Sequence, residues 1–171
     1  MTKATLIGDK ISSNSKAAQE LFSSQRFGEK SGEKIIYSLA EALFLVESKK
    51  LEIYDHRDKK ISTKKLLTRF QKISKKFRIN YSVFKDLRKR GYIVKTALKF
   101  GAEFRVYEKK AQVGKQHAKW ILYPIDEHST LTWHDFSAKN RVAHSTKKNL
   151  LIAIVDDEGD VSYYEVGWIR P

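Results

Sequence analysis

Three residues in the second half of the chain could together cleave RNA through its own 2′-hydroxyl group. That reaction needs a base for the hydroxyl proton, an acid for the leaving 5′-oxygen and a cation beside the phosphate. Tyr107, His117 and Lys148 are candidates for these roles, with Lys147 as a second possible cation. A free imidazole, with a pKa of about 6.5, suits the acid, whereas a free phenol, with a pKa of about 10, is an unusual base. Neighbouring cations would have to favour the phenolate.

Other assignments remain open from the residues alone. Tyr107 is equally compatible with a structural role in its strand, and His117 with His144 could form a ribonuclease-like pair of histidines. Tyr107 and His117 are ten positions apart, up to about 33 Å if the chain is extended. The two can therefore meet at one phosphate only if the intervening loop folds back, which Gly114 would allow.

A metal-dependent DNA nuclease is a separate hypothesis. Such a site needs carboxylates that hold Mg²⁺ beside a lysine, and Asp86, Glu108 and Lys110 provide an acidic pair with E-x-K spacing. That spacing is expected by chance in a chain so rich in Glu and Lys. The sequence has no Cys, no Walker-type phosphate loop and no H-E-x-x-H motif. We therefore expect neither a metal site nor a cofactor.

The charge of the chain favours a polyanionic partner. Lys and Arg number 34 against 20 Asp and Glu, a formal net charge of +14. The charge is uneven: residues 81–119 contain 11 basic and 3 acidic residues, whereas residues 120–171 contain 5 and 8. No apolar run approaches the roughly 18 residues of a membrane span, and the N-terminus lacks a signal-peptide pattern. We expect a cytoplasmic protein with no membrane partner.

Hydrophobic periodicity predicts an α+β protein with two small domains, residues 1–76 and 77–171, divided within the polar run 74–80. In the first domain we expect a strand over 4–11, helices from about residue 16 and over 38–50, a strand over 51–55 and a helix that begins at Ser62. Ser38 is a candidate N-cap.

The second domain should begin with a helix between Asn80, as its N-cap, and Gly91, as its stop. Further along we expect strands over 92–98, 102–108 and about 117–123, a weakly indicated helix over 130–140, and a hairpin of residues 148–155 and 161–169. The first hairpin strand is apolar throughout and should be buried on both faces. In the strand 102–108, Tyr107 falls on the polar side.

Three features of the second half follow one another in a distinctive order and spacing: YSVFKDLRKRGYIVKTALKFGAEFRVYE (81–108), His117 and RVAHSTKKNLLIAIVDDEGD (141–160). In these features the second half resembles the catalytic domain of the archaeal tRNA-splicing endonuclease family. The first half matches more loosely, through SLAEALFLVESKKLEI (38–53). The resemblance implies that the C-terminal domain is restriction-endonuclease-like, with a central mixed sheet flanked by helices.

The resemblance also implies a chemistry. Family members cleave without metal and leave a 2′,3′-cyclic phosphate and a 5′-hydroxyl, which implies Tyr107 as base, His117 as acid and Lys148 as cation. Two positions depart from the family pattern: Ala97 stands where Gly is usual, and Lys147 where Arg is common. The alanine matters only if its backbone needs a positive φ.

The implied RNA partner is precursor tRNA with a bulge–helix–bulge at the intron–exon junctions. Arg141 matches a family arginine that packs against a bulged base, with a helix-end salt bridge as the alternative role. Trp168 is a second candidate platform for a base, although its place near the last strand favours a buried aromatic residue. A non-catalytic RNA-binding subunit is the alternative function.

The resemblance further implies assembly into a tetramer. In the family, an acidic loop of one subunit inserts into a basic groove on another. The matching residues here are Asp156, Asp157, Glu158 and Asp160, which otherwise form a solvated hairpin turn. A homotetramer is the first expectation, and a heterotetramer with a separate structural subunit is the alternative.

Overall fold

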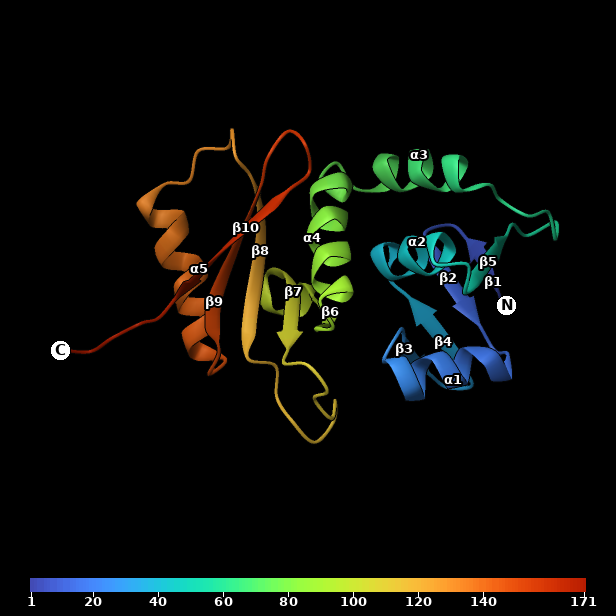
Figure 1. Cartoon of the computed structure of the whole chain (residues 1–171), viewed down its shortest axis with the longest axis horizontal. Helices are drawn as coiled ribbons and strands as arrows, with labels where there is room; N and C mark the ends of the chain where they lie inside the picture. The colour runs from blue at the N-terminus through green and yellow to red at the C-terminus, as the bar shows by residue number, and fades with distance from the viewer. The chain divides into compact units, whose positions relative to one another are not determined.

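The computed structural model describes residues 1–171, which form two compact units, Met1–Arg78 and Ile79–Pro171 (Figure 1). Each unit has its own five-stranded sheet and its own helices. The predicted α+β class is therefore confirmed. None of the helices combines the length and apolar character that crossing a bilayer would require.

The first unit is a sheet in the order β3-β4-β2-β1-β5 with three helices. Its strands are β1 (Thr2–Ile7), β2 (Lys10–Ser13), β3 (Glu29–Ser31), β4 (Lys34–Tyr37) and β5 (Leu51–Tyr54). Its helices are α1 (Lys16–Gln25), α2 (Leu39–Glu47) and α3 (Thr63–Ile73). The single strand predicted over 4–11 is instead a hairpin, because Gly8, with φ +63°, turns the chain between β1 and β2.

Serine side chains begin all three helices of this unit. Ser15, Ser38 and Ser62 each accept a hydrogen bond from a backbone N–H in the first turn. In α2, Glu41 completes a capping box with Ser38 and also accepts the N–H of Gly28, at 2.9 Å. These bonds compensate the burial of the Glu41 carboxylate, which is only 3% exposed.

The second unit is a mixed sheet in the order β10-β9-β8-β7-β6, in which only β8 and β9 are parallel. Its strands are β6 (Ile93–Ala97), β7 (Ala102–Tyr107), β8 (Trp120–Asp126), β9 (Asn149–Val155) and β10 (Val161–Val166). The helices are α4 (Phe77–Lys89), which begins at the boundary between the units, the 3₁₀ turn η1 (Leu98–Phe100) and α5 (Trp133–Ser145).

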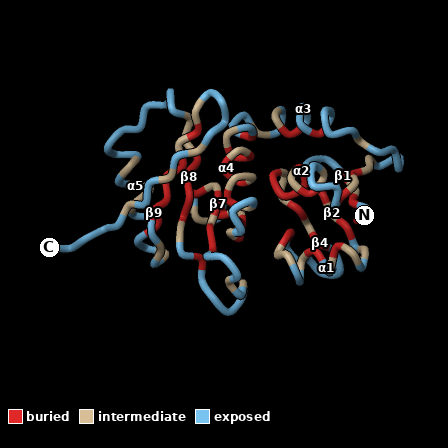
Figure 2. The backbone as a smooth tube through the Cα atoms, in the orientation of Figure 1, coloured by how far each residue is buried: buried red, intermediate tan, exposed pale blue.

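Helices cover both faces of this sheet. Phe84 of α4 packs on Phe104 of β7, and Ala143 of α5 lies in one core cluster with Ile121 and Leu150. Figure 2 shows the buried residues concentrated in the central strands. A strand between two helices has no solvated face, which explains why residues 150–153 of β9 are apolar and buried, as predicted, although Asn149 at its start is exposed. The predicted mixed sheet flanked by helices is present.

Two predicted helices have different limits in the structure. Asn80 is not an N-cap, because α4 begins at Phe77, whose buried ring extends the apolar face by one turn. Asn80 lies inside the helix and donates its Nδ2–H to Glu103, at 3.0 Å. The weakly indicated helix over 130–140 is α5, which begins after a Thr132–Asp135 capping box and runs five residues further, to Ser145.

Candidate active site

Three segments of the second unit meet at one end of its sheet, where β7 ends and β8 and β9 begin (Figure 1). The backbone of Lys119 joins them: its N–H donates to the carbonyl of Val106 at 2.9 Å, and its carbonyl accepts the N–H of Asn149 at 3.0 Å. Tyr107 follows Val106, His117 lies two residues before Lys119, and Lys148 precedes Asn149. The three candidate catalytic residues therefore flank one continuous set of backbone hydrogen bonds.

Tyr107 lies on the same side of β7 as Arg105, as predicted, but it is buried, with only 5% of its surface exposed. Its ring packs against Ile93 and Ala118, and two further loop residues, Ala111 and Val113, complete the cluster. The loop after β7 covers the end of the strand, and this cover is what alternation along a single strand cannot reveal. Packing holds the aromatic ring in one place at the edge of the sheet.

The loop between Tyr107 and His117 does fold back on itself. Val113 and Gln116 form an isolated bridge around Gly114, whose φ is +98°. Ala118 is then buried against Tyr107, whereas its neighbour His117 is exposed. The imidazole of His117 is therefore open to solvent, next in the chain to a residue that packs on Tyr107, and is available to a bound substrate.

Lys148 is positioned by the turn that ends α5. The backbone N–H of Lys147 donates to the carbonyl of His144 at 3.0 Å, and the backbone N–H of Lys148 donates to the carbonyl of Ala143 at 2.9 Å. This is the hydrogen-bond pattern of a Schellman motif. Lys147 takes the left-handed position of this motif, with φ +56°, where glycine is usual. The turn reverses the chain from α5 into β9 and leaves Lys148 at the strand's start.

The Lys148 ammonium lies among groups on the face of the sheet that α5 covers. It donates to the carbonyl of Thr146 at 2.8 Å and lies 5.9 Å from the centre of the Phe100 ring. Burial, and then the charge of Arg105, lower the pKa of Lys148 below its ordinary value. Since Arg105 and Tyr107 are two residues apart on β7, they share one face of the sheet, and the ammonium lies toward that face.

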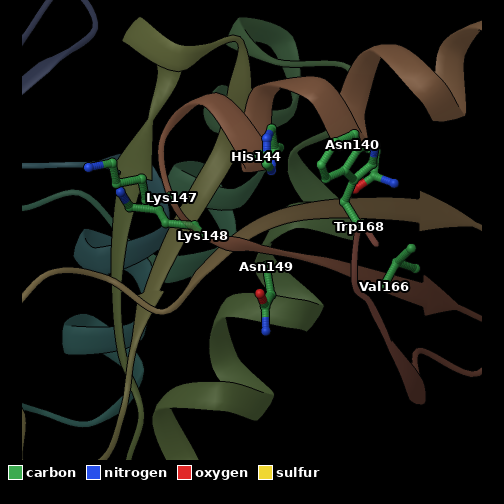
Figure 3. Close-up of a pocket in the computed structure, with 7 residues that line it drawn as sticks. All are labelled: Asn140, His144, Lys147, Lys148, Asn149, Val166 and Trp168. Atoms are coloured by element: carbon green, nitrogen blue, oxygen red, sulfur yellow. The ribbon is translucent and has the colours of Figure 1, made fainter. Parts of the chain in front are cut away.

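A polar pocket of about 150 Å³ adjoins Lys148, with seven residues along its wall: Asn140, His144, Lys147, Lys148, Asn149, Val166 and Trp168 (Figure 3). The rings of Trp168 and His144 are 4.2 Å apart between centroids, while the two lysine side chains extend away from them. Trp168 is 51% exposed, so the expectation of a buried aromatic residue is wrong. The strand β10 ends at Val166, before the tryptophan.

Two other sequence expectations concern single positions. Arg141 is exposed on α5 and has no carboxylate partner, so its alternative role in a helix-end salt bridge is not formed. Ala97 has φ −133°, a value that any residue adopts, although a glycine is common there in the resembled family. The alanine therefore introduces no backbone strain.

The acidic turn lies at the opposite end of the sheet, where β9 passes into β10. Asp156 orders it, since one carboxylate oxygen accepts the N–H groups of Glu158 and Asp160, at 3.0 and 2.9 Å. The side chains of Asp157, Glu158 and Asp160 remain exposed.

Two residues beside this turn were missed from the sequence. The N–H of Asp157 donates to Glu127 at 3.0 Å, and its carboxylate lies 3.2 Å from Nε2 of His128. A hydrogen bond and the charge of Asp157 raise the pKa of His128. Roughly 30 positions separate these partners in the chain, so no local pattern could have revealed them.

The carboxylates of the metal-nuclease hypothesis do not come together. Asp86 accepts hydrogen bonds from Arg90 and Tyr163, each at 2.8 Å, and Glu108 pairs with Lys119 at 2.8 Å. Neither carboxylate belongs to a group of three possible metal donors, and Lys110 lies in the exposed loop. The one such group is exposed and lies beside the acidic turn: Glu127, His128 and Asp157.

Comparisons with known proteins identify the family of this chain. The model of the tRNA intron endonuclease catalytic C-terminal domain matches residues 77–163, and the model of the N-terminal domain of the same family matches residues 2–67. Among curated relatives, the tRNA-splicing endonuclease of Pyrococcus horikoshii is 42% identical over 166 residues, which cover 96% of this chain and 95% of that protein.

Other archaea contain similar proteins. The tRNA-splicing endonuclease of Nanoarchaeum equitans is 42% identical over 139 residues, covering 78% of this chain and 88% of that protein. That of Methanothermobacter thermautotrophicus is 39% identical over 154 residues, covering 90% and 89%. Both domain models match in order, and the similarity extends over nearly the whole chain. This chain is therefore an enzyme of the tRNA intron endonuclease family.

Proposed function

We propose that this chain excises introns from precursor tRNA, without a metal ion, by cutting at bulge–helix–bulge junctions. The observation that carries the proposal is the set of Lys119 backbone bonds, which brings the segments of Tyr107, His117 and Lys148 to one end of one sheet. Family membership supports the substrate, and the net charge of +14 suits a polyanion.

In the proposed reaction the RNA supplies its own nucleophile. The phenolate of Tyr107 takes the proton of the 2′-hydroxyl, and the 2′-oxygen attacks the adjacent phosphorus. The bond from phosphorus to the 5′-oxygen breaks, and protonated His117 donates its proton to that oxygen. The products are a 2′,3′-cyclic phosphate and a 5′-hydroxyl, so no water molecule is consumed in this step.

Lys148 would stabilise the charge that develops on the non-bridging phosphate oxygens. Its Nζ is held by the Thr146 carbonyl, and partial burial strengthens its field compared with a solvated lysine. Arg105 adds a second positive charge on the same side.

Recognition and assembly complete the proposal. Exposed Arg141 and half-exposed Trp168 offer planar groups on which an unpaired base can stack. The acidic turn, from Asp156 to Asp160, would dock on a basic surface of another subunit, and a homotetramer would present two active sites to the two bulges. A heterotetramer with a structural subunit is the alternative assembly.

The test is cleavage of an intron-containing precursor tRNA by the purified protein in excess EDTA, with analysis of the product ends. We expect cuts at both junctions, with cyclic phosphate and 5′-hydroxyl ends. Cleavage that appears only after Mg²⁺ is restored would overturn the metal-free mechanism. Failure under both conditions, with retained RNA binding, would instead indicate a binding subunit that needs a catalytic partner.

A further inference from the structure

The first unit has a cationic surface of its own, formed by residues that have no part in the proposed catalysis. From Lys59 to Arg78 the sequence contains nine Lys or Arg residues and no Asp or Glu. Most of this segment is α3 and the turn that follows it. Residues 68–76 fall between the two regions that the family models match, so neither domain model describes them.

The fold of α3 gathers these charges on one side. Leu66 and Phe70 are fully buried and fix the inner face of the helix. Successive residues of a helix turn by about 100°, so the positions opposite this face form one contiguous outer arc. The residues on that arc, which we call the α3 basic face, are Lys64, Lys65, Thr68, Arg69 and Lys72, all exposed.

The charges of the α3 basic face are not neutralised within the protein. Lys64, Lys65 and Lys72 take part in no ion pair, and the exposed Lys75 and Lys76 continue the surface past the helix. Arg69 donates to the carbonyl oxygen of Gly8 at 2.8 Å, which orients the guanidinium but leaves its charge uncompensated. A cluster of unpaired, like-signed cations is stabilised by a polyanion and by little else.

We infer that the α3 basic face binds the phosphate backbone in the folded body of the precursor tRNA. This inference rests on the proposed function for its substrate. Lys64, Thr68 and Lys72 recur every four residues, about 6 Å along the helix axis, and therefore form a row that can follow a nucleic-acid strand. Lysine ammonium groups bind phosphates as point charges without reading bases. Such contacts suit the body of a folded RNA, where shape and backbone dominate recognition.

A second copy of this chain is the competing occupant, because its acidic turn also carries negative charge. The extent of the surface favours RNA. An 11-residue helix is about 16 Å long, and the two lysines beyond it lengthen the cationic surface. The acidic turn is closed between Asp156 and Asp160 by mutual hydrogen bonds and can therefore cover only part of that length.

The test uses mature tRNA, which has the same body as the precursor but no intron to cut. Binding to the full chain is measured by fluorescence anisotropy across a series of salt concentrations. The variant Lys64→Gln/Lys65→Gln/Lys72→Gln removes three charges and keeps helix-compatible side chains. The matched control, Lys10→Gln/Lys30→Gln/Lys34→Gln, removes three exposed lysines from β2 and the β3–β4 hairpin of the same unit.

We expect the α3 variant to bind tRNA at least about tenfold more weakly at 0.1 M salt, and its log–log salt slope to fall by roughly 2–3. The control variant should show a much smaller loss of tRNA affinity and a much smaller change of the salt slope. Equal losses in the two variants, or none in either, would overturn the inference. So would an α3 variant that dissociates in light scattering while its affinity for tRNA is unchanged, because the face would then dock a second copy.

Cleavage of precursor tRNA by the same proteins separates this inference from the proposed function. At saturating enzyme the α3 variant should cut at the unmodified rate, because it alters no residue of the catalytic site. If the unmodified protein binds tRNA through α3 but never cleaves precursor, the proposed function fails and the inference stands. If the unmodified protein cleaves the precursor and the α3 variant binds tRNA as tightly as the unmodified protein does, only the inference fails.

Discussion

The two ends of the sheet in the second unit carry opposite charge and are held in place by different interactions. One end gathers Lys148, Arg105 and the buried Tyr107 ring, which are held by core packing and by a strained turn. The other end presents an acidic hairpin turn that is held by its own hydrogen bonds and is exposed. The seven-residue strand β9, from Asn149 to Val155, separates them by about 20 Å. The comparison suggests that chemistry and assembly can be altered independently.

The largest expected effect is at the basic end. His117→Ala should lower the single-turnover cleavage rate by roughly 10²–10⁴-fold, the usual contribution of a general acid. Because His117 is exposed, thermal stability should be unchanged. His134→Ala, an exposed histidine on α5, is the control and should retain full activity. Equal losses in the two variants would count against an acid role for His117.

The next effect concerns the pH dependence of the same end. Burial and Arg105 lower the pKa of Lys148, so its ammonium is lost below the ordinary lysine value of 10.5. If that charge stabilises the transition state, cleavage should fall on the alkaline side before pH 10.5 is reached. Lys148→Arg keeps the charge, because a guanidinium stays protonated, and should move the fall to higher pH. An unchanged alkaline limb in rate–pH profiles would assign it to another group.

At the acidic end, assembly should change while the fold persists. The triple variant Asp157→Asn/Glu158→Gln/Asp160→Asn removes three exposed charges but keeps Asp156, which orders the turn. We expect light scattering to show an assembly of lower mass, while the melting temperature of the individual subunit stays unchanged. A particle of unaltered mass would show that the turn is only a solvated hairpin. Asp156→Ala should instead destabilise the turn, by about 1 kcal/mol.

A smaller effect should come from the strained turn at Lys147. Its φ of +56° is unfavourable for a residue with a Cβ atom, by roughly 1–2 kcal/mol. Lys147→Gly relieves that strain at the cost of greater freedom in the unfolded chain, so we expect a net stabilisation of at most about 1 kcal/mol. Denaturant unfolding measures it. A destabilised variant would mean that the Lys147 side chain contributes more than its backbone strain costs.

The smallest effect is a titration. Asp157 raises the pKa of His128, so Asp157→Asn should lower that pKa toward about 6.5. A histidine whose pKa is raised by folding contributes its full stabilisation when the pH is below its pKa in the unfolded chain. That contribution is lost as the pH rises through its pKa in the folded protein. NMR titration of the imidazole measures the shift. Since both groups are exposed, only a slight change of stability is expected.

Much of the fold follows from local pattern. Ser38 caps a helix as predicted, a helix begins directly after Ser62, and Gly91 and Gly101 adopt the positive φ that their turns need. The start of α4 was misplaced because Phe77, which packs the first turn of the helix, lies within a polar run before Asn80. The β3–β4 hairpin was missed because its strands are too short to show a hydrophobic periodicity.

By itself the sequence determined which residue types were available, their charge pattern and the family resemblance, because these depend only on identity and spacing. The tertiary structure decided which of them meet. It buried Tyr107 under its own loop, set Lys148 toward Arg105, exposed Trp168 and paired His128 with Asp157. Those outcomes depend on contacts between segments far apart in the chain. Periodicity describes one segment at a time and cannot supply them.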